Sequence, residues 1–271
     1  MHLLAHCRAG MGSAQSFLTR LAFDCLAEWQ DVRRHPVAAQ MDLLRDPEVR
    51  RRLVDAGHHG RYDSSFGVEA VRPRFNSMEV VLSPYLPNPT VSDEAARRGV
   101  DPIEAMIDIA LEHDLDVLFF TSFARQDDDE RLLALLRHPL SAMCFSDSGA
   151  HVSQIFDSSI YTHLLTYWVR DRQALSLEEA VHMMTAKPAA VWRLGDRGRL
   201  APGYAADITI FDPATVSPEM PKVVADLPGG AQRLDQRAVG YSATIVNGQV
   251  LMRDAEPTEA RSGRLLRRRT A

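Results

Sequence analysis

The spacing of apolar residues predicts a helical beginning to the chain. Apolar residues recur at three- and four-residue intervals from Ala14 to Trp29, which predicts one amphipathic helix over residues 14–30. Asp46-Pro47 combines a capping residue with a proline at the first helical position, and Gly57 closes this second helix. Residues 57–77 are rich in Gly, Ser, Arg and His, which is typical of a loop.

From Met78 onward the pattern changes to strands that alternate with helices. Apolar runs predict strands over 78–83, 117–121 and 142–146, and helices fall between them, starting at Asp101-Pro102 and covering 127–137. Parallel strands need helical crossovers, so this order favours a parallel α/β sheet buried on both faces. A complete eight-fold barrel needs eight strands and about 250 residues. With three clear strands and a fourth candidate near the N-terminus, we expect at most half a barrel.

The last third of the chain changes from helix to strand. Helices are predicted over 159–172 and from Ser176, where Ser176 and Glu179 have the spacing of a capping box. Strand-like runs follow over 199–211 and 244–253, and the second contains Asn247-Gly248, a pair favoured in two-residue hairpins. The pattern predicts a small β module at the end of the chain.

Composition narrows the class of protein. The 271 residues include 45% hydrophobic and 25% charged residues, with a net charge of −5 and a pI near 6.1, so nothing attracts nucleic acid or anionic lipid in general. The three cysteines, Cys7, Cys25 and Cys144, argue against a disulfide framework and against a cysteine-built zinc site. No apolar run has the length of a signal peptide or membrane span. We expect a cytoplasmic protein with small-molecule chemistry and no membrane partner.

Asp147 is the residue best placed for chemistry. It directly follows the predicted strand 142–146, and residues at the carboxyl ends of barrel strands meet the substrate, where a carboxylate suits a metal ligand or proton carrier. A helix cap or loop-stabilising role fits the pattern equally well. His151 lies four residues later, within reach of the same pocket if the loop turns back, although a solvated or structural histidine is the simpler interpretation.

Other polar groups carry weaker chemical interpretations. The pairs His2/His6 and His58/His59 are interpreted as solvated or structural, because no glutamate accompanies the first and a polar loop holds the second. The acids at 127–130 suit a helix start, because the helix dipole favours negative charge there. The basic tail, Arg264 and Arg267–Arg269, is interpreted as a solvated terminus, with nucleic-acid contact as the alternative.

Several stretches together resemble one family. The resemblance is to the amidohydrolase superfamily: to the end of its last barrel strand, to its C-terminal signature and to the hairpin that follows it. The matching stretches are Phe145–Val152, Thr185–Ala190, Gly198–Asp212 and Val246–Gly248.

Within that superfamily the chain is most similar to the N-acyl-D-amino-acid deacylase (D-aminoacylase) branch. Asp226-Leu-Pro-Gly-Gly230 and Gly240-Tyr-Ser-Ala-Thr244 support this choice. Upstream, residues 99–105 and 137–139 also resemble the family, so the resemblance covers most of residues 40–271.

The resemblance implies an α/β fold. Residues 1–195 are expected to form the C-terminal part of a TIM-like (β/α)8 metal-dependent hydrolase barrel. Residues 196–271 are expected to form part of a small C-terminal β-sandwich module with a basic tail.

The family chemistry implied is zinc-assisted hydrolysis of a non-peptide amide C–N bond, with N-acyl-D-amino acids as substrates. Asp147 matches the last-strand aspartate, which contacts the metal or its water and shuttles the proton. His151 matches a position near the active site. The acyl group, the amino-acid side chain and the chirality are left open.

The departures from the family pattern predict that the metal site of this chain is incomplete. The His-x-His pair of the first strand is absent, and no later His or Cys aligns with the central-strand ligands, whereas a zinc site commonly needs three protein ligands. We therefore expect the chain alone to hold little zinc, to be inactive and to expose an open strand edge. The alternative is a catalytically incompetent remnant or half-enzyme that acts by associating with a separately encoded N-terminal half.

Overall fold

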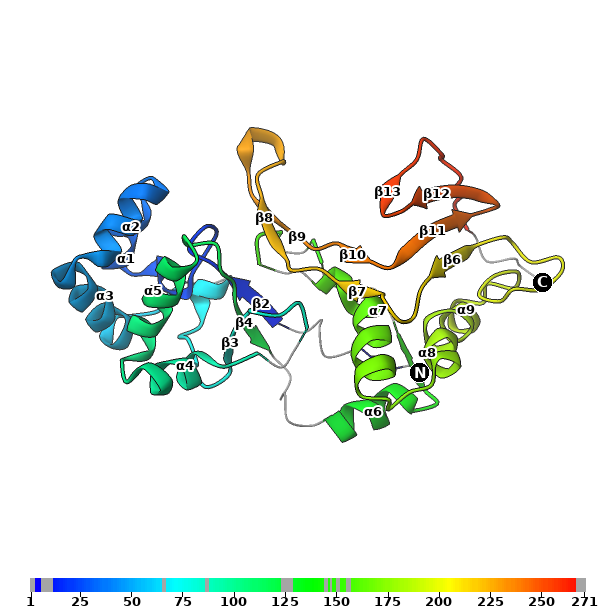
Figure 1. Ribbon diagram of the computed structural model, residues 1–271, viewed down its shortest axis with the longest axis horizontal. Coiled ribbons are helices and arrows are strands. Elements are labelled where there is room, and N and C mark those ends of the chain that lie inside the picture. The colour runs from blue at the N-terminus through cyan, green and yellow to red at the C-terminus, as the bar shows by residue number, and fades with distance from the viewer. Residues whose placement is uncertain are drawn as a thin grey trace.

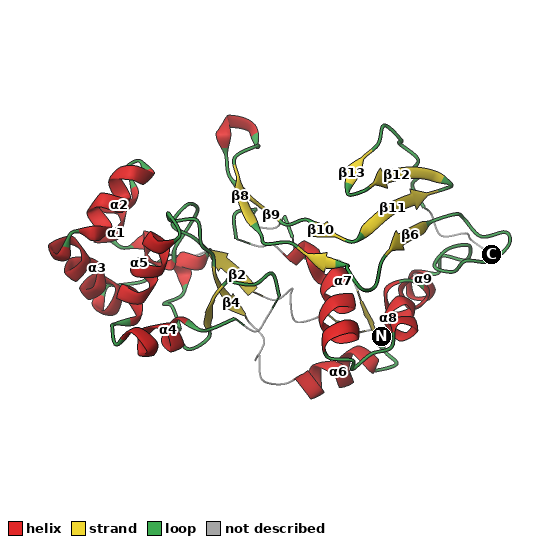
Figure 2. Cartoon of the chain, viewed as in Figure 1, coloured by secondary structure: helices red, strands yellow, loops and turns green. Residues whose placement is uncertain are grey.

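The computed structural model describes residues 3–5, 12–64, 67–85, 88–122, 129–143, 146, 148–149, 152–154 and 157–266. Figure 1 shows two groups of helices at opposite ends of an elongated molecule, α1–α5 at one end and α6–α9 at the other. Strands lie between and above the two groups (Figure 2).

The first helical group begins at well-defined caps. Asp46 accepts hydrogen bonds from the N–H groups of Glu48 and Val49, and Asp101 accepts one from Ile103, as the Asp-Pro pairs predicted. Thr90 forms a capping box with Asp93 at the start of a helix that the sequence analysis missed. The helices of this group are α1 (Ala27–Arg33), α2 (Val37–Arg45), α3 (Pro47–His59), α4 (Val91–Arg98) and α5 (Pro102–Glu112).

The single helix predicted over residues 14–30 is wrong. This stretch contains the strand β2 (Gly12–Gln15), the 3₁₀ turn η2 (Ala22–Cys25) and the start of α1. The side chain of Gln15 accepts the N–H of Ala22 at 2.7 Å, and Asp24 accepts that of Leu21 at 3.0 Å. These side-chain bonds satisfy the backbone in a turn instead of a helix. The predicted apolar positions Ala14, Leu21 and Trp29 are nevertheless fully buried.

The predicted end of the second helix at Gly57 is also wrong, because α3 continues to His59. Gly57 is buried inside the helix, and a Cβ there would collide with the Ile103 side chain and lie 3.3 Å from Phe23. The glycine serves close packing of α3 on its neighbours, so it is no terminator here.

The central sheet has the order β2-β4-β3, and both pairs are antiparallel. Its other strands are β3 (Met78–Val80) and β4 (Phe119–Ser122), which lie near the predicted positions. The parallel arrangement predicted for these two strands is wrong. A short apolar run indicates burial on both faces but does not encode strand direction, and the intervening α4 and α5 allow either direction.

A parallel pair is present elsewhere. The strand β1 (Leu3–Ala5) pairs in parallel with β5 (Ser141–Met143), with Leu4 opposite Ala142. One further strand was expected near the N-terminus, and the first 15 residues contain two, β1 and β2, while β5 matches the predicted strand 142–146 in part. The parallel α/β arrangement is therefore confirmed for one pair of strands.

The second helical group packs around β5. The predicted helix 159–172 is present as α7 (Ile160–His163) continued by a π-helical segment, η5 (Leu164–Asp171), and Ser176 caps α8 through the N–H of Glu179 at 3.1 Å. The remaining helices are α6 (Asp129–Arg137), α8 (Leu177–Met184) and α9 (Ala186–Trp192).

The last part of the chain is β structure, as predicted. A four-stranded antiparallel sheet has the order β13-β12-β11-β6, and Asn247-Gly248 turns between β11 and β12 with positive φ at both residues. Its strands are β6 (Ile208–Phe211), β11 (Tyr241–Val246), β12 (Gln249–Arg253) and β13 (Glu256–Pro257). Two smaller pairs precede it: β7 (Ser217–Pro218) with β10 (Ala238–Val239), and β8 (Lys222–Val224) with β9 (Arg233–Asp235).

The buried apolar residues form separate clusters. The largest joins α1–α5 to one face of the central sheet, with Trp29, Phe23 and Phe119 at less than 1% exposure. A second cluster joins α6, α7 and η5 to Val216. The side chain of Tyr241 packs against this cluster. The β module is thus attached to the second helical group by apolar contact. Within the described ranges, no helix combines the length and the apolar character needed to cross a membrane.

Candidate functional site

The two residues on which the predicted chemistry depends, Asp147 and His151, lie outside the described residues. The same holds for His2, His6 and the first two acids of the 127–130 group. Their roles therefore stay predictions, and the site is built from the residues on either side of them.

The strand that leads toward Asp147 is buried and closely packed. β5 lies in contact with α6, α8 and α9 and ends at Met143, four residues before Asp147. Its backbone runs parallel to β1, so the carboxyl ends of both strands face the same way. In parallel α/β proteins the active site lies at the carboxyl ends of such strands, and for β5 this is the end at Met143.

The segment just after His151 is anchored to two other parts of the chain. The carbonyl of Gln154 accepts the N–H of Ala14 at 2.6 Å, and the carbonyl of Val152 accepts the N–H of Leu234 at 2.8 Å. Gln154 is buried. Residues 152–154 are thus held between β2 of the first group and β9 of the β module.

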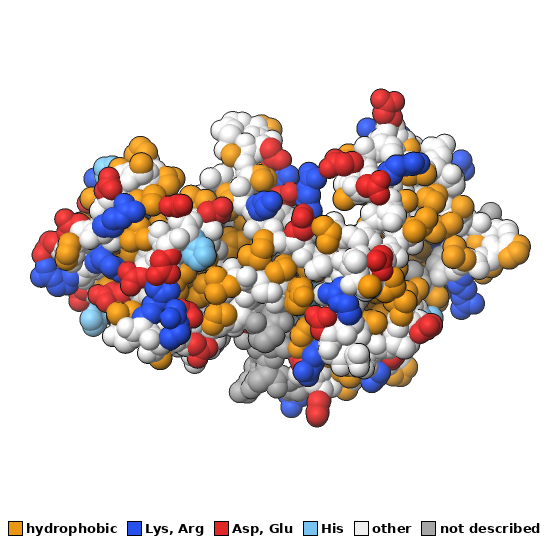
Figure 3. All heavy atoms as spheres, viewed as in Figure 1, with side chains coloured by type: hydrophobic (Ala, Val, Ile, Leu, Met, Phe, Trp, Pro, Cys, Tyr) orange, Lys and Arg blue, Asp and Glu red, His pale blue; other side chains and the backbone are white. Residues whose placement is uncertain are grey.

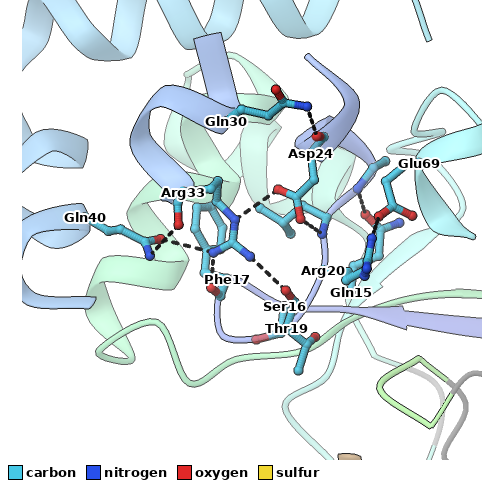
Figure 4. A network of polar contacts seen from close by, with 12 residues as sticks. Gln15, Ser16, Phe17, Thr19, Arg20, Asp24, Gln30, Arg33, Gln40 and Glu69 are labelled. Atoms are coloured by element: carbon cyan, nitrogen blue, oxygen red, sulfur yellow. Dashed lines mark hydrogen bonds and ion pairs between the residues drawn. The ribbon is translucent and has the colours of Figure 1, made fainter. Parts of the chain in front are cut away.

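The loop that follows β2 is held by a buried arginine (Figure 4). The guanidinium of Arg33 donates to Asp24 at 3.0 Å, to the carbonyl of Thr19 at 2.9 Å, to the carbonyl of Phe17 and to the side chain of Gln40 at 3.1 Å. The Arg33 side chain is 12% exposed. One side chain on α1 therefore fixes the path of residues 17–19.

A second ion pair stands at the end of the same loop, where Figure 4 shows Arg20 beside Glu69. Arg20 Nη1 lies 2.5 Å from Oε1 of Glu69, whose side chain is 7% exposed, whereas the arginine side chain is 55% exposed. The hydrogen bond with Glu69, reinforced by its negative charge, raises the pKa of Arg20. Sequence reasoning did not find this pair, because its members are 49 residues apart and share no local pattern.

The acids at 127–130 contain one residue with a defined structural role. Asp129, at the first position of α6, accepts a hydrogen bond from the Tyr167 hydroxyl at 2.7 Å and pairs with Arg172 at 3.1 Å. Tyr167 also stacks on the buried ring of His163 at a centroid distance of 5.1 Å. This agrees with the interpretation of Asp129 as a helix-start acid.

His58 and His59 lie in the last turn of α3, so the polar loop predicted for them is wrong, but their contacts agree with their interpretation as solvated or structural residues. His58 Nε2 lies 2.7 Å from Oδ2 of Asp101, the cap of α5, and His59 contacts Asp55 on its own helix at 3.0 Å. Among the residues that the structure describes, no group of three or more His, Cys, Asp or Glu side chains could hold a metal ion. The described residues therefore do not form a zinc site.

The β module has a pocket of about 510 Å³. It lies against the four-stranded sheet and is mostly apolar, with Tyr241 and Met252 in its wall and Arg237 at its rim, where the guanidinium contacts Glu256 at 3.2 Å. Figure 3 shows a hollow between the β8–β9 hairpin and the β12–β13 end, with acidic and basic side chains at its edges.

Comparison with known proteins identifies the family. The family model described as "Amidohydrolase family" matches residues 4–252, so the chain belongs to this family. The resemblance read from the sequence is thereby confirmed, and with it the assignment of the α/β part to an amidohydrolase-type fold.

Among the curated relatives, the N-acyl-D-glutamate deacylase of Alcaligenes xylosoxydans xylosoxydans is 41% identical over 108 residues, which cover 40% of this chain and 20% of the relative. The D-aminoacylase of the same organism is 35% identical over 111 residues, 41% of this chain and 21% of the relative. A solved D-aminoacylase, studied for its binuclear metal centre, is 25% identical with a TM-score of 0.43, over 70% of this chain and 38% of that one. The matched region thus spans about a fifth of the length of the curated relatives.

Proposed function

We propose that this chain belongs to an enzyme that hydrolyses the amide C–N bond of N-acyl-D-amino acids with the help of a metal ion. Three observations support this: the family match over residues 4–252, the 41% identity to a deacylase over 108 residues, and the place of Asp147 in the sequence. The family match carries the proposal. Asp147 comes four residues after β5 ends at Met143, and in barrel enzymes the residues that follow the carboxyl ends of strands meet the substrate.

In this proposal Asp147 is the proton carrier. It accepts a proton from the attacking water as the new C–O bond forms, and it delivers that proton to the amine nitrogen as the C–N bond breaks. His151 is proposed as a neighbour of the substrate. Zinc is the proposed metal, by resemblance, and it would supply Lewis-acid activation of the water. The described residues do not form a metal site, so none of them is proposed as a zinc ligand.

The division into a barrel portion, 1–195, and a β module, 196–271, is likewise proposed. The β module packs on the second helical group through Val216 and Tyr241. That group also packs on β5, so the module would support the strand that precedes Asp147 in the sequence.

The test is hydrolysis of N-acetyl-D-glutamate by the purified chain, with zinc content measured by elemental analysis on the same sample. In a chain that hydrolyses the substrate, Asp147→Asn should lower the rate by about 100-fold or more, the usual size of a general acid–base contribution. Asp116→Asn is the matched control, because Asp116 is exposed in the loop before β4, and it should leave the rate unchanged. A fully active Asp147→Asn chain would contradict the assignment. A folded chain without zinc or activity would instead support the half-enzyme alternative.

A further inference from the structure

The open edge of β2 brings Arg20 next to the segment that follows the proposed catalytic loop. β2 lies at the edge of the sheet β2-β4-β3. The N–H of Ala14 donates to Gln154, and the N–H of Ser16, just after the strand, donates to the carbonyl of Arg20 at 2.9 Å. Amides two residues apart point the same way and lie about 7 Å apart. Arg20 and Gln154 are therefore neighbours along one edge.

The side chains behind these two residues also meet. A Cβ placed on Gly67 would lie 2.5 Å from Oε2 of Glu69 and 3.5 Å from Nε2 of Gln154. The side chains of Glu69 and Gln154 therefore both lie close to the backbone of Gly67. This residue has a φ of +74°, which favours glycine. Glu69 pairs with the Arg20 guanidinium, and Glu69 and Gln154 both lie beside Gly67.

The guanidinium of Arg20 is bonded to Glu69 through one of its three nitrogens. Nη1 bonds to Glu69, and in the described part of the chain neither Nε nor Nη2 has a hydrogen-bond partner. The side chain is 55% exposed, so these donors are open to a ligand. The preceding loop is fixed by Arg33, so Arg20 is positioned before any ligand arrives.

We propose that Arg20, oriented by Glu69, binds the α-carboxylate of the N-acyl amino acid. This rests on the proposed function and names the group of the substrate that is recognised. Nε–H and Nη2–H point outward along one edge of the planar guanidinium and form the fork that matches the two oxygens of a carboxylate. The α-carboxylate is common to all N-acyl amino acids, so this contact would select the class of substrate and leave its side chain to other residues.

The experiment is isothermal titration calorimetry of the purified chain with N-acetyl-D-alanine and with N-acetyl-D-alaninamide, which lacks the carboxylate. The wild-type chain should bind the acid at least tenfold more tightly than the amide. Arg20→Gln alone would leave a buried, unpaired Glu69 and endanger folding. The double variant Arg20→Gln/Glu69→Gln replaces the ion pair with two neutral amides and should remove the preference with the fold intact, as measured by circular dichroism.

The matched control is Arg34→Gln, which removes an exposed arginine paired with Asp31 on α1 and should keep the preference for the acid. The inference is overturned if the folded double variant still prefers the acid, or if the wild type binds both compounds equally or not at all. A chain that hydrolyses amides without a preference dependent on Arg20 would refute this inference alone. Binding dependent on Arg20 without hydrolysis would refute the proposed activity alone.

Discussion

Replacing Arg33 should measure how strongly the loop after β2 is held. Its guanidinium donates to Asp24, to the side chain of Gln40 and to two loop carbonyls, those of Phe17 and Thr19. Arg33→Met keeps most of the side-chain volume and removes every one of these donors. Asp24, whose side chain is 18% exposed, would then lose its cationic partner.

The expected loss in the free energy of unfolding follows from the burial of the Arg33–Asp24 ion pair. Removing one partner of a buried ion pair costs about 3–5 kcal/mol, mostly because the remaining charge is left unpaired. Both side chains here keep some access to solvent, so the lower end, about 3 kcal/mol, is expected. This is a large fraction of the roughly 5–15 kcal/mol that stabilises a typical domain.

The assay is urea unfolding followed by tryptophan fluorescence. Trp29 is fully buried and stacks on Phe23 at a centroid distance of 4.3 Å, so this cluster contributes to the signal together with Trp168 and Trp192. Arg33→Lys keeps the charge without the planar fork and should lose less stability. Asp24→Asn combined with Arg33→Met should recover part of the loss, because asparagine still has an oxygen to accept the N–H of Leu21. A loss below about 1 kcal/mol for Arg33→Met, with an unchanged m-value, would refute the reasoning.

Two further predictions concern the β module. Gly240→Ala should lower the free energy of unfolding by about 2–4 kcal/mol and shift the urea midpoint, because φ is +83° and a Cβ would lie 2.5 Å from the backbone of Val216; an unchanged midpoint would contradict this. Burial raises the pKa of Asp207, but hydrogen bonds from the Asn247 N–H and the Arg197 guanidinium outweigh it and leave the pKa lowered. The stabilisation is therefore complete above the unfolded-state pKa of about 4 and is lost as the pH falls further. Thermal unfolding from pH 5 to pH 3 should show a smaller loss for Asp207→Asn than for the wild type, and equal losses would argue against the assignment.

Short-range signals in the sequence predicted local structure well. Asp46, Asp101 and Ser176 each cap the helix that follows, because the bonds that they make lie within three residues along the chain. The Asn247-Gly248 turn is equally local, since its positive φ angles are a property of these two residues. The family resemblance also depended on contiguous stretches of sequence.

Apolar periodicity alone was less reliable. The spacing from Ala14 to Trp29 correctly indicated buried positions, but the stretch divides into a strand, a turn and a helix. The bonds from Gln15 and Asp24 to the backbone of the turn decide this, together with pairing between β2 and β4, which lies more than 100 residues away. Strand direction in the central sheet likewise depends on partners that the pattern does not name.

The sequence by itself determined the family, the Asn247-Gly248 turn and the helix caps, because each depends on residues that are neighbours in the chain. Only the tertiary structure decided that β3 and β4 run antiparallel and that Arg20 meets Glu69. Those contacts join residues about 40 or more positions apart along the chain. They exist because the packed core brings the segments together, and no local pattern encodes which distant partner a buried charge or a strand edge will find.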